Sequence, residues 1–479
     1  MTQYGAVHPE RCAGRAKKEE REAMDCGEKI DRLQEELSGL LGPEWVTRIG
    51  SSLNVKPRTA EEIAAILRVA DRTETAVRPR GGGTGWWSST QPPAGGILLQ
   101  MSRMNEVLAV DQDMMTVRVE AGITFAKIEE ALASRGCRIV IFPESGRAAT
   151  VGGHIQTWGT SPHTSSLYED QATQILGLKV VLPDGEIVPT GTGAVTAAGK
   201  DFSRRFFPAD LTGLFFGSEG AFGVIAEATL KIHRLPEATR TRLAGFPELA
   251  AAVAALGAFQ QKLRGGGLST LVEQRLVPRE MLLAAIPRLE GSVPAAVKFL
   301  LVLRAEGDAA DVERHMAAAC GLSREQGGQI VADDLPEWWE GRFGSFPAAG
   351  LGKGPRIMIV AMVPFPKMAD AYAVVEAFGA RHGLSLKLRG YPFGGPVFLA
   401  HASISWEAGR PDGRAEALAR ARELMAALIG VGAVPHRVGT DFLPLLVERL
   451  DPAYYRFVKR VKGLLDPRGI MNPGVITAG

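Results

Sequence analysis

The sequence has little cysteine and no paired cysteine motif. Its 479 residues include four cysteines, and no two of them are spaced as CxxC. They are Cys12, Cys26, Cys137 and Cys320. Zinc sites and disulfide frameworks are marked by closer or more regular spacing. We therefore interpret the cysteines as reduced thiols and predict a cytoplasmic protein.

Long apolar runs and a strong net charge are also missing. No apolar stretch reaches the roughly 18 residues of a membrane-spanning helix, so no membrane span is expected. The formal net charge is +2, which gives no broad field for a polyanion, so nucleic acid is not expected as a partner. Charged residues such as Arg11, Arg15 and Lys17 precede any apolar run, so no secretory signal is expected. These arguments leave binding to a membrane surface open.

Composition and length indicate a globular protein of two or three domains. The chain is 46% hydrophobic and 23% charged, which is ordinary for this class. Apolar runs predict strands at residues 75–78, 116–120 and 139–142, while the alanine-rich stretch at 250–263 predicts a helix. Blocks of this kind, segregated along the chain, predict an α+β fold and a two-domain enzyme.

Glycine is abundant, and several glycines are clustered in short segments that could bind a ligand through backbone N–H groups. The first glycine-rich segment follows the strand predicted at 75–78. Glycine allows the backbone to turn and brings N–H groups close to a ligand, and consecutive N–H groups bind phosphate well. An arginine in the segment adds a charge-assisted hydrogen bond. The residues expected to contact the ligand here are Pro79, Arg80, Gly81, Gly82, Gly83, Thr84 and Gly85.

Two further glycine-rich segments also lie beside short apolar runs. One contributes Pro143, Ser145, Gly146, Thr150, Gly152 and Gly153, and the other Glu219, Gly220, Gly223, Val224 and Ile225. Three such segments predict one long ligand, such as a dinucleotide with its pyrophosphate and two ring systems. Three unrelated turns are the alternative. A GxGxxG motif is absent, and the stretch at 193–201 fails as a phosphate P-loop because Asp201 replaces the metal-binding hydroxyl residue.

Seven segments, taken in order, resemble one enzyme family. They are Pro57–Ile63, Pro79–Gly85, Met101–Asn105, Val119–Gly122, Thr150–Gly153, Gly213–Gly220 and Leu465–Gly474. The chain is similar over residues 55–474 to the FAD-dependent oxidoreductases of the vanillyl-alcohol oxidase / p-cresol methylhydroxylase (PCMH) superfamily, which includes D-lactate and glycolate dehydrogenases. The resemblance implies that FAD is the cofactor, and that the three glycine-rich segments and Asn472 contact it.

The resemblance also implies the domain plan. A split PCMH-type FAD-binding domain, made of two α/β subdomains, is expected together with an α+β cap domain built on an antiparallel sheet. The expected boundaries are an N-terminal helical segment at 1–48, the FAD-binding domain at 49–235, the cap at 236–429 and a C-terminal segment returning to the FAD site at 430–479.

Three residues are the expected catalytic groups. In the family, substrate loses a hydride to flavin N5 from a carbon that bears oxygen or is conjugated to it. Arg437 resembles the arginine beside flavin N1, where reduced flavin carries negative charge, with a surface or phosphate-binding arginine as the alternative. Asp170 resembles the acid near N5, although a solvated loop acid is the alternative. His436 is expected to bind a substrate oxygen or act as a base, with a core histidine as the alternative. His154, His163, Trp86, Trp87 and Arg342 are further candidates for the substrate pocket.

The substrate branch is less clear than the family. The hydroxy-acid branch usually carries a His-x-Gly-Asp-Gly-Asn-x-His metal motif, of which only His401 remains here, and Pro435 replaces the glutamate of a later motif. No metal site is therefore expected. The first interpretation is oxidation of an alcohol or a para-substituted phenol. The alternatives are a D-2-hydroxy-acid dehydrogenase and a catalytically silent subunit of a larger complex. The electron acceptor (oxygen, quinone or partner protein) and a homodimeric or hetero-oligomeric assembly stay open.

Overall fold

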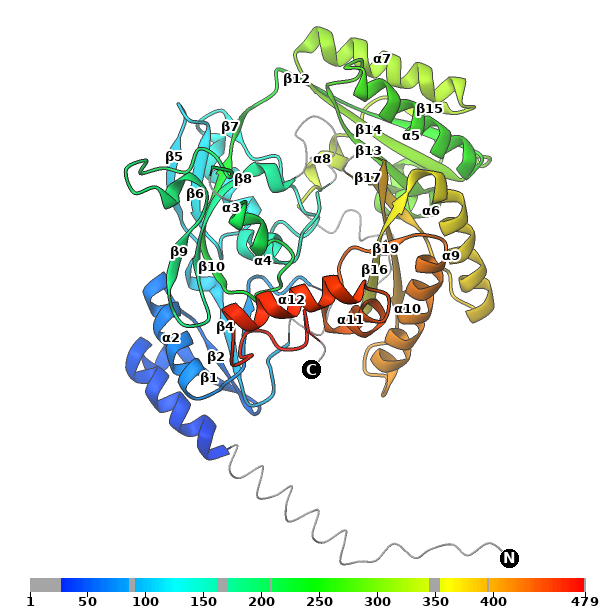
Figure 1. The fold of residues 1–479 in the computed structure, drawn as a ribbon. Helices are drawn as coiled ribbons and strands as arrows, with labels where there is room; N and C mark the ends of the chain where they lie inside the picture. The colour runs from blue at the N-terminus through cyan, green and yellow to red at the C-terminus, as the bar shows by residue number, and fades with distance from the viewer. Residues whose placement is uncertain are drawn as a thin grey trace, which may run out of the picture.

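Two lobes of mixed helix and sheet face each other, and the last long helix lies across the front of the molecule (Figure 1). The computed structural model describes residues 27–85, 91–161, 171–206, 209–343, 354–393 and 396–477. Within these residues, no helix combines the length and apolar character needed to cross a bilayer. The alternation of separate helical and sheet blocks agrees with the predicted α+β class.

The first lobe begins with a small mixed sheet covered by two helices. A helix over residues 27–41 and α2 (Ala60–Arg72) enclose its apolar core. The strands, in spatial order, are β1 (Val46–Ile49), β2 (Ser52–Val55), β4 (Ile97–Gln100) and β3 (Val77–Arg80). β3 runs parallel to β4. It ends at Arg80, directly before the glycines of the first glycine-rich segment.

A second, antiparallel sheet completes this lobe. Its strands, in spatial order, are β5 (Val107–Asp111), β6 (Thr116–Glu120), β10 (Val224–Lys231), β8 (Ile175–Val181) and β9 (Ile187–Pro189). Helices α3 (Phe125–Ala133) and α4 (Val151–Gln156) contribute to the core on this sheet. A two-stranded ribbon joins β7 (Cys137–Arg138) to β11 (His233–Arg234). The strand predicted at 139–142 does not form, because the Ile139 and Phe142 N–H groups donate to side chains of Glu129 and Ser161 instead of to a strand.

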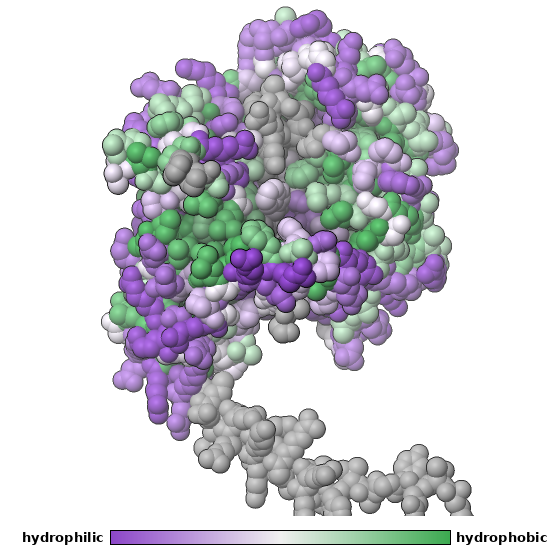
Figure 2. Space-filling view, in the orientation of Figure 1, coloured by the Kyte–Doolittle hydropathy of each residue, from purple (hydrophilic) through white to green (hydrophobic). Residues whose placement is uncertain are grey.

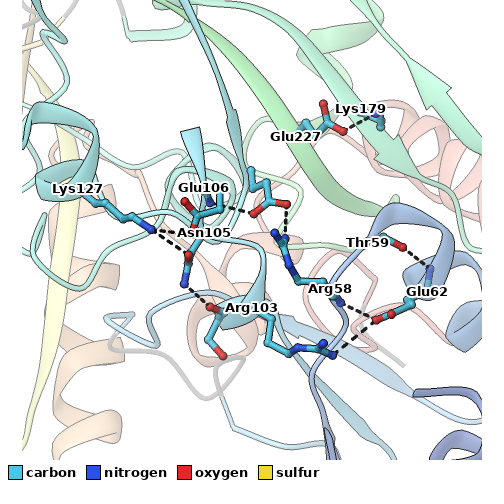
Figure 3. A network of polar contacts seen from close by, with 11 residues as sticks. Arg58, Thr59, Glu62, Arg103, Asn105, Glu106, Lys127, Lys179 and Glu227 are labelled. Atoms are coloured by element: carbon cyan, nitrogen blue, oxygen red, sulfur yellow. Dashed lines mark hydrogen bonds and ion pairs between the residues drawn. The ribbon is translucent and has the colours of Figure 1, made fainter. Parts of the chain in front are cut away.

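Charged side chains hold the two sheets of the first lobe together (Figure 3). At the start of α2, Thr59 accepts a hydrogen bond from the Glu62 N–H at 3.1 Å, and the Glu62 carboxylate accepts one from the Arg58 N–H at 2.6 Å. The Arg58 side chain then pairs with Glu120 of β6. Because the start of α2 is bonded to β6, the helix cap and the contact between the sheets depend on the same residues.

The second lobe is built on an eight-stranded antiparallel sheet. Its spatial order is β15 (Gln329–Ala332), β12 (Ala238–Phe246), β14 (Phe299–Gly307), β13 (Leu271–Pro278), β17 (Arg389–Pro392), β18 (Val397–Ser405), β16 (Arg356–Pro364) and β19 (Val434–Pro435). Four long helices pack on one face and share the largest apolar core, namely α5 (Leu249–Arg264), α7 (Ala309–Glu325), α9 (Met368–His382) and α10 (Gly413–Gly430). The opposite face of β16, β17 and β18 is therefore free to form a wall toward the first lobe.

Shorter elements connect these layers. The remaining α-helices are α6 (Arg279–Ala285), α8 (Pro336–Glu340), α11 (Gly439–Val447) and α12 (Pro452–Leu465). The 3-10 helices are η1 (Pro43–Trp45), η3 (Met101–Arg103), η5 (Gln171–Gln174), η6 (Gly191–Ala194), η7 (Leu211–Phe215), η8 (Pro287–Leu289) and η10 (Phe365–Lys367). After α12 the chain returns to the first lobe, where Met471 bridges to Val77 of β3. Segments from both ends of the chain thus meet beside the first glycine-rich segment.

Candidate active site

A cavity of about 690 Å³ lies where the glycine-rich segments of the first lobe meet the sheet of the second. Most of the predicted ligand contacts line it: Pro79, Arg80, Gly81, Gly82, Gly83, Thr84, Gly85, Pro143, Ser145, Thr150, Gly152, Gly153, Glu219, Val224, Ile225, Asn472 and Arg437. Segments from residue 79 to residue 472 therefore contribute to one site, as expected for a long ligand.

Close backbone packing explains why the first segment requires glycine. A Cβ on Gly82 would lie 1.6 Å from the Ala148 carbonyl oxygen, and one on Gly81 would lie 2.0 Å from Thr150 Oγ1. Gly83 has a φ of +64°, which L side chains rarely adopt. The first and second glycine-rich segments thus pack backbone against backbone. The cradle that results lines the cavity together with Arg80.

The C-terminal return is fixed by buried polar contacts. Lys462 Nζ donates to the carbonyl oxygens of Ala221 and Met471, each at 2.8 Å, and pairs with Asp466. Asn472 accepts a hydrogen bond from Arg78 Nε at 2.6 Å, and its own N–H donates to the Val77 carbonyl at 2.8 Å. These bonds place Asn472 at the wall of the cavity, although it is almost 400 residues from Arg78 in sequence.

Three of the predicted glycine contacts lie behind the wall. Gly146, Gly220 and Gly223 are not among the residues that line the cavity. A Cβ on Gly146 would strike the ring of Phe343, and one on Gly220 would lie 2.8 Å from Pro79 Cγ. These glycines permit close packing of neighbouring cavity residues. Glu219 Oε1, in contrast, accepts a hydrogen bond from the Gly439 N–H at 3.0 Å and so connects the third segment to the start of α11.

The second lobe contributes a wall on which three residues stand in one row. Val360 of β16 pairs with His401 of β18, and His401 pairs with Arg389 of β17. Side chains of paired residues in an antiparallel sheet point to the same face. All three line the cavity, together with Met358 and Tyr391 on the same face. The sheet register therefore places a cation beside an imidazole on one cavity wall.

Glu144 of the first lobe reaches across to this wall. Its carboxylate accepts hydrogen bonds from Arg389 at 2.7 and 3.1 Å and from Arg275 of β13 at 2.8 Å. Burial alone would raise the pKa of Glu144, but the two guanidinium groups outweigh burial and lower the pKa to about 2. Arg275 also pairs with Glu273 at 3.0 Å, so two buried arginines face two carboxylates and the four side chains carry no net charge.

His401 is a neutral hydrogen-bond acceptor at the cavity wall. Burial, followed by the charge of Arg389, lowers its pKa well below the usual value, so the ring is neutral. Its buried Nε2 has no hydrogen-bond partner within the described part of the chain. A neutral imidazole nitrogen beside a cavity can accept a proton from a bound hydroxyl group.

Arg437 and His436 take different positions, although they are adjacent in sequence. Arg437 lines the cavity and donates to Thr160 Oγ1 at 3.2 Å. His436 is not among the lining residues; its Nε2 donates to the Trp158 carbonyl at 3.0 Å, and its ring packs edge-on against Phe393. His436 therefore holds the Trp158 end of the segment that carries Thr160, which in turn contacts Arg437.

Comparison with known proteins identifies the family. The FAD binding domain model matches residues 51–191, and the model of the C-terminal domain of FAD linked oxidases matches residues 235–476, which is half of the chain. The chain belongs to the FAD-linked oxidase family. It is therefore an FAD-linked oxidoreductase, as the sequence predicted, and FAD is its cofactor.

Curated relatives of this FAD-linked oxidase include a glycolate oxidase subunit and a D-lactate dehydrogenase. The glycolate oxidase subunit GlcD of Bacillus subtilis is 26% identical over 443 residues, which covers 88% of each chain. The mitochondrial D-lactate dehydrogenase [cytochrome] of Arabidopsis thaliana is 27% identical over 433 residues, with 88% of this chain and 72% of the relative covered.

Solved structures show the same fold. The 4-ethylphenol oxidase of Gulosibacter chungangensis aligns with a TM-score of 0.80 at 18% identity, over 94% of this chain and 97% of that one. A p-cresol methylhydroxylase with substrate bound aligns with a TM-score of 0.78 at 16% identity, over 94% of this chain and 96% of that one. The PCMH-type fold predicted from the sequence is confirmed.

The remaining predicted residues have different outcomes. Asp170, His163, Trp86 and Trp87 lie outside the described residues. Arg342 is paired with Glu129 at 3.5 Å and stacks over Trp339, so it supports the packing between the lobes. His154 does line the cavity, as predicted. No group of three or more His, Cys, Asp or Glu side chains suited to a metal ion occurs within the described ranges.

The wall that the second lobe contributes, called the cap wall below, was not predicted from the sequence. Glu144, Arg275, Arg389, Tyr391 and His401 were not proposed as substrate contacts, although Glu144 lies in the second glycine-rich segment and His401 in the altered metal motif. One signal was present. Arg389, Tyr391 and His401 alternate with small or apolar residues along β17 and β18, a pattern that indicates a face with a polar function.

The partly buried position of His436 predicts a pH dependence of stability. Burial and the charge of Arg437 lower its pKa to about 3, whereas the hydrogen bond to Trp158 raises it. An unfolded histidine titrates near ~6.5, so between these values only the unfolded chain binds the proton, and stability falls as pH decreases, by up to about 1.4 kcal/mol per pH unit.

We expect His436→Gln to flatten the pH dependence of unfolding. Glutamine can still donate to Trp158 but does not titrate. The free energy of unfolding in urea, measured from pH 7.5 to pH 4, should have a slope lower by about 1 kcal/mol per unit in the variant below pH 6.5. Above pH 7 the two curves should run parallel, which serves as the internal control. Parallel curves over the whole range would contradict the assignment.

Proposed function

We propose that this FAD-linked oxidase dehydrogenates a small 2-hydroxy carboxylate at the carbon that bears the hydroxyl group. The observation that carries the proposal is the pair of Arg389 and His401 on one cavity wall, side by side in the sheet. A 2-hydroxy acid presents a carboxylate and a hydroxyl group on neighbouring carbons. A buried cation and a neutral base in adjacent positions match those two groups.

The roles of the cavity residues follow from their chemistry. Bound FAD supplies the acceptor for the two electrons. Arg389 binds the substrate carboxylate, and His401 Nε2 accepts the hydroxyl proton. Tyr391 donates a hydrogen bond, since burial raises its pKa to about 12 and keeps its hydroxyl protonated. The apolar side chains of Met358 and Val360 exclude water beside these polar groups.

The first-lobe residues are proposed to hold the cofactor. The cradle of Gly81, Gly82 and Gly83 would bind the pyrophosphate through backbone N–H groups, with Arg80 adding charge. Arg437 would stabilise the negative charge that develops on the reduced cofactor. His436 is assigned a positioning role through Trp158, and Asp170 remains a predicted acid near the flavin.

A para-substituted phenol is the second candidate substrate. It is favoured by Tyr391 and Arg437, a phenol hydroxyl and a guanidinium that both contact Thr160 and line the cavity. A hydroxyl donor and a cation together stabilise a phenolate. The hydroxy acid is preferred because a phenol leaves the Arg389–His401 pair without a substrate group to bind.

Anaerobic flavin bleaching distinguishes these substrates. We expect the visible flavin band of the purified enzyme to bleach with a small 2-hydroxy acid, such as glycolate or one enantiomer of lactate, and to persist with a 4-alkylphenol or a benzylic alcohol. EDTA should leave the rate unchanged, because the assigned residues include no metal ligands. Bleaching by phenols alone would replace the proposal with the second candidate. A rate abolished by EDTA and restored by a divalent ion would contradict the assigned roles.

A further inference from the structure

Helix α12 carries apolar side chains that the fold does not use. Tyr454 is 58% exposed, Phe457 is 60% exposed and Leu464 is 82% exposed. Phe457 and Leu464 are seven residues apart, so they project from the same face of the helix, two turns from each other. Large apolar groups at this level of exposure are costly in water, and two of them in one line on a single helix form a stripe.

The buried side of α12 already accounts for its attachment to the protein. Val461 and Leu465 pack against the core of the first lobe. Lys462 is buried and bonded to the carbonyl oxygens of Ala221 and Met471. Val461 lies between Phe457 and Leu464 on the helix surface, so the stripe borders the buried side of α12. Most of the Phe457 and Leu464 surface nevertheless stays exposed, so packing of the helix on its own lobe does not explain it.

Basic residues occupy the solvent-facing surface of α12 beside the stripe. Arg456, Lys459 and Arg460 are exposed, and the helix contains no acidic residue between Pro452 and Leu465. No ion pair involves these three side chains among the residues that the structure describes, although Lys459 lies 4.9 Å from the centre of the Tyr455 ring. Figure 2 shows a strongly hydrophilic strip at the position of α12, and a hydrophobic area of the first lobe beside it.

We propose that α12 docks this enzyme on the surface of an anionic phospholipid membrane. Apolar side chains flanked by arginine and lysine are the pattern by which a helix lies in the lipid interface. Each basic residue near an anionic surface adds about 1 kcal/mol, and inserted apolar side chains add to this at short range. A surface that faces only water does not favour exposed apolar side chains such as Phe457 and Leu464. The proposal rests on α12 alone and does not depend on the substrate.

The structure argues for lipid over a second copy of the chain. A partner copy seated on α12 by symmetry would bring Arg456, Lys459 and Arg460 of both chains near one another without an acidic residue of the helix to pair with them. Anionic headgroups supply that missing negative charge. Charge complementarity therefore selects a lipid surface.

Sedimentation of the FAD-loaded enzyme with vesicles tests the proposal. Vesicles of equal parts phosphatidylcholine and phosphatidylglycerol should bind the enzyme at low salt, pure phosphatidylcholine should bind it at least about tenfold more weakly, and high salt should release it, since screening removes the headgroup attraction. Equal binding to both vesicle types, or no binding to either, would overturn the proposal.

Surface variants distinguish binding through α12 from nonspecific binding of the protein to vesicles. Arg456→Glu with Arg460→Glu, and separately Phe457→Ser with Leu464→Ser, should each weaken binding to the anionic vesicles at least about tenfold. The matched controls are Arg324→Glu at the end of α7 and Leu40→Ser, which is 50% exposed on the helix at 27–41; both should bind as the wild type does. Flavin content and flavin reduction rate should be unchanged in all four.

Light scattering on the same proteins measures the oligomeric state and so tests whether α12 is instead an interface between copies of the chain. A wild-type dimer that the α12 variants convert to a monomer, with no vesicle binding by either, would show that the stripe is an interface between copies and would overturn the lipid assignment. An unchanged oligomeric state together with lost vesicle binding supports it.

Discussion

Replacing Arg389 by methionine is expected to lower kcat/KM for the 2-hydroxy acid at least about a hundredfold, because a bound carboxylate loses a buried charged partner worth roughly 3–5 kcal/mol. Methionine keeps much of the side-chain volume and removes the charge. Most of the effect should appear in KM, since the carboxylate is bound in the ground state as well as in the transition state. Steady-state kinetics with a dye acceptor give the measurement, and the flavin spectrum shows whether FAD is retained.

Arg275 provides the matched control for this variant. It binds the same carboxylate of Glu144 at 2.8 Å but does not line the cavity. Arg275→Met should therefore change kcat/KM by less than about tenfold if the loss in Arg389→Met reflects a missing substrate contact and not a freed Glu144. A substrate analogue with a neutral group in place of the carboxylate should be oxidised equally by wild type and Arg389→Met. Equal losses in the two arginine variants would refute a direct role for Arg389.

The second large effect is expected at Gly82, where alanine should weaken FAD binding at least about tenfold and produce largely colourless protein. The added Cβ would lie 1.6 Å from the Ala148 carbonyl, so the backbone of one glycine-rich segment must move away from the other. Overpacking of this kind costs about 1–3 kcal/mol or more. The ratio of flavin to protein absorbance after gel filtration, and the FAD dependence of the melting temperature, report the loss.

Gly257 is a suitable control for that substitution. It lies in α5 of the second lobe, and a Cβ at this position would have no neighbour within 4 Å. Gly257→Ala should keep its FAD and be more stable by up to about 1 kcal/mol, as expected for alanine in a helix. Full FAD retention by Gly82→Ala would show that the two segments can separate without disturbing the cofactor.

The first-lobe side of the site could be predicted because its determinants are local. A stretch such as Gly81–Gly83 requires glycine for its own turn and for close approach, and both requirements are visible in consecutive residues. The cap at Thr59 is likewise a contact between residues three apart. Arg437 was placed through its resemblance to a family motif, and it does line the cavity.

The cap wall could not be predicted in the same way. Glu144 and Arg389 are 245 residues apart, and Arg437 and Thr160 are 277 residues apart. The positions of Val360, His401 and Arg389 in one row depend on the register of three strands. A shift of one residue in either pairing would turn a side chain to the opposite face, and no feature of the individual strands specifies that register.

His436 illustrates the same division. Its sequence position beside Arg437 indicated a place in the site, but the backbone directs neighbouring side chains differently, and the imidazole bonds to Trp158 instead of lining the cavity. His401, in an altered motif, lines the cavity in its place.

The sequence by itself determined the family, the cofactor and the glycine-rich segments, since these depend on residue types at short, fixed spacings. Only the tertiary structure decided which charged groups meet at the substrate side and which face of α12 remains exposed. Those outcomes depend on contacts between segments hundreds of residues apart, whose free energy is gained only when both lobes are folded and packed.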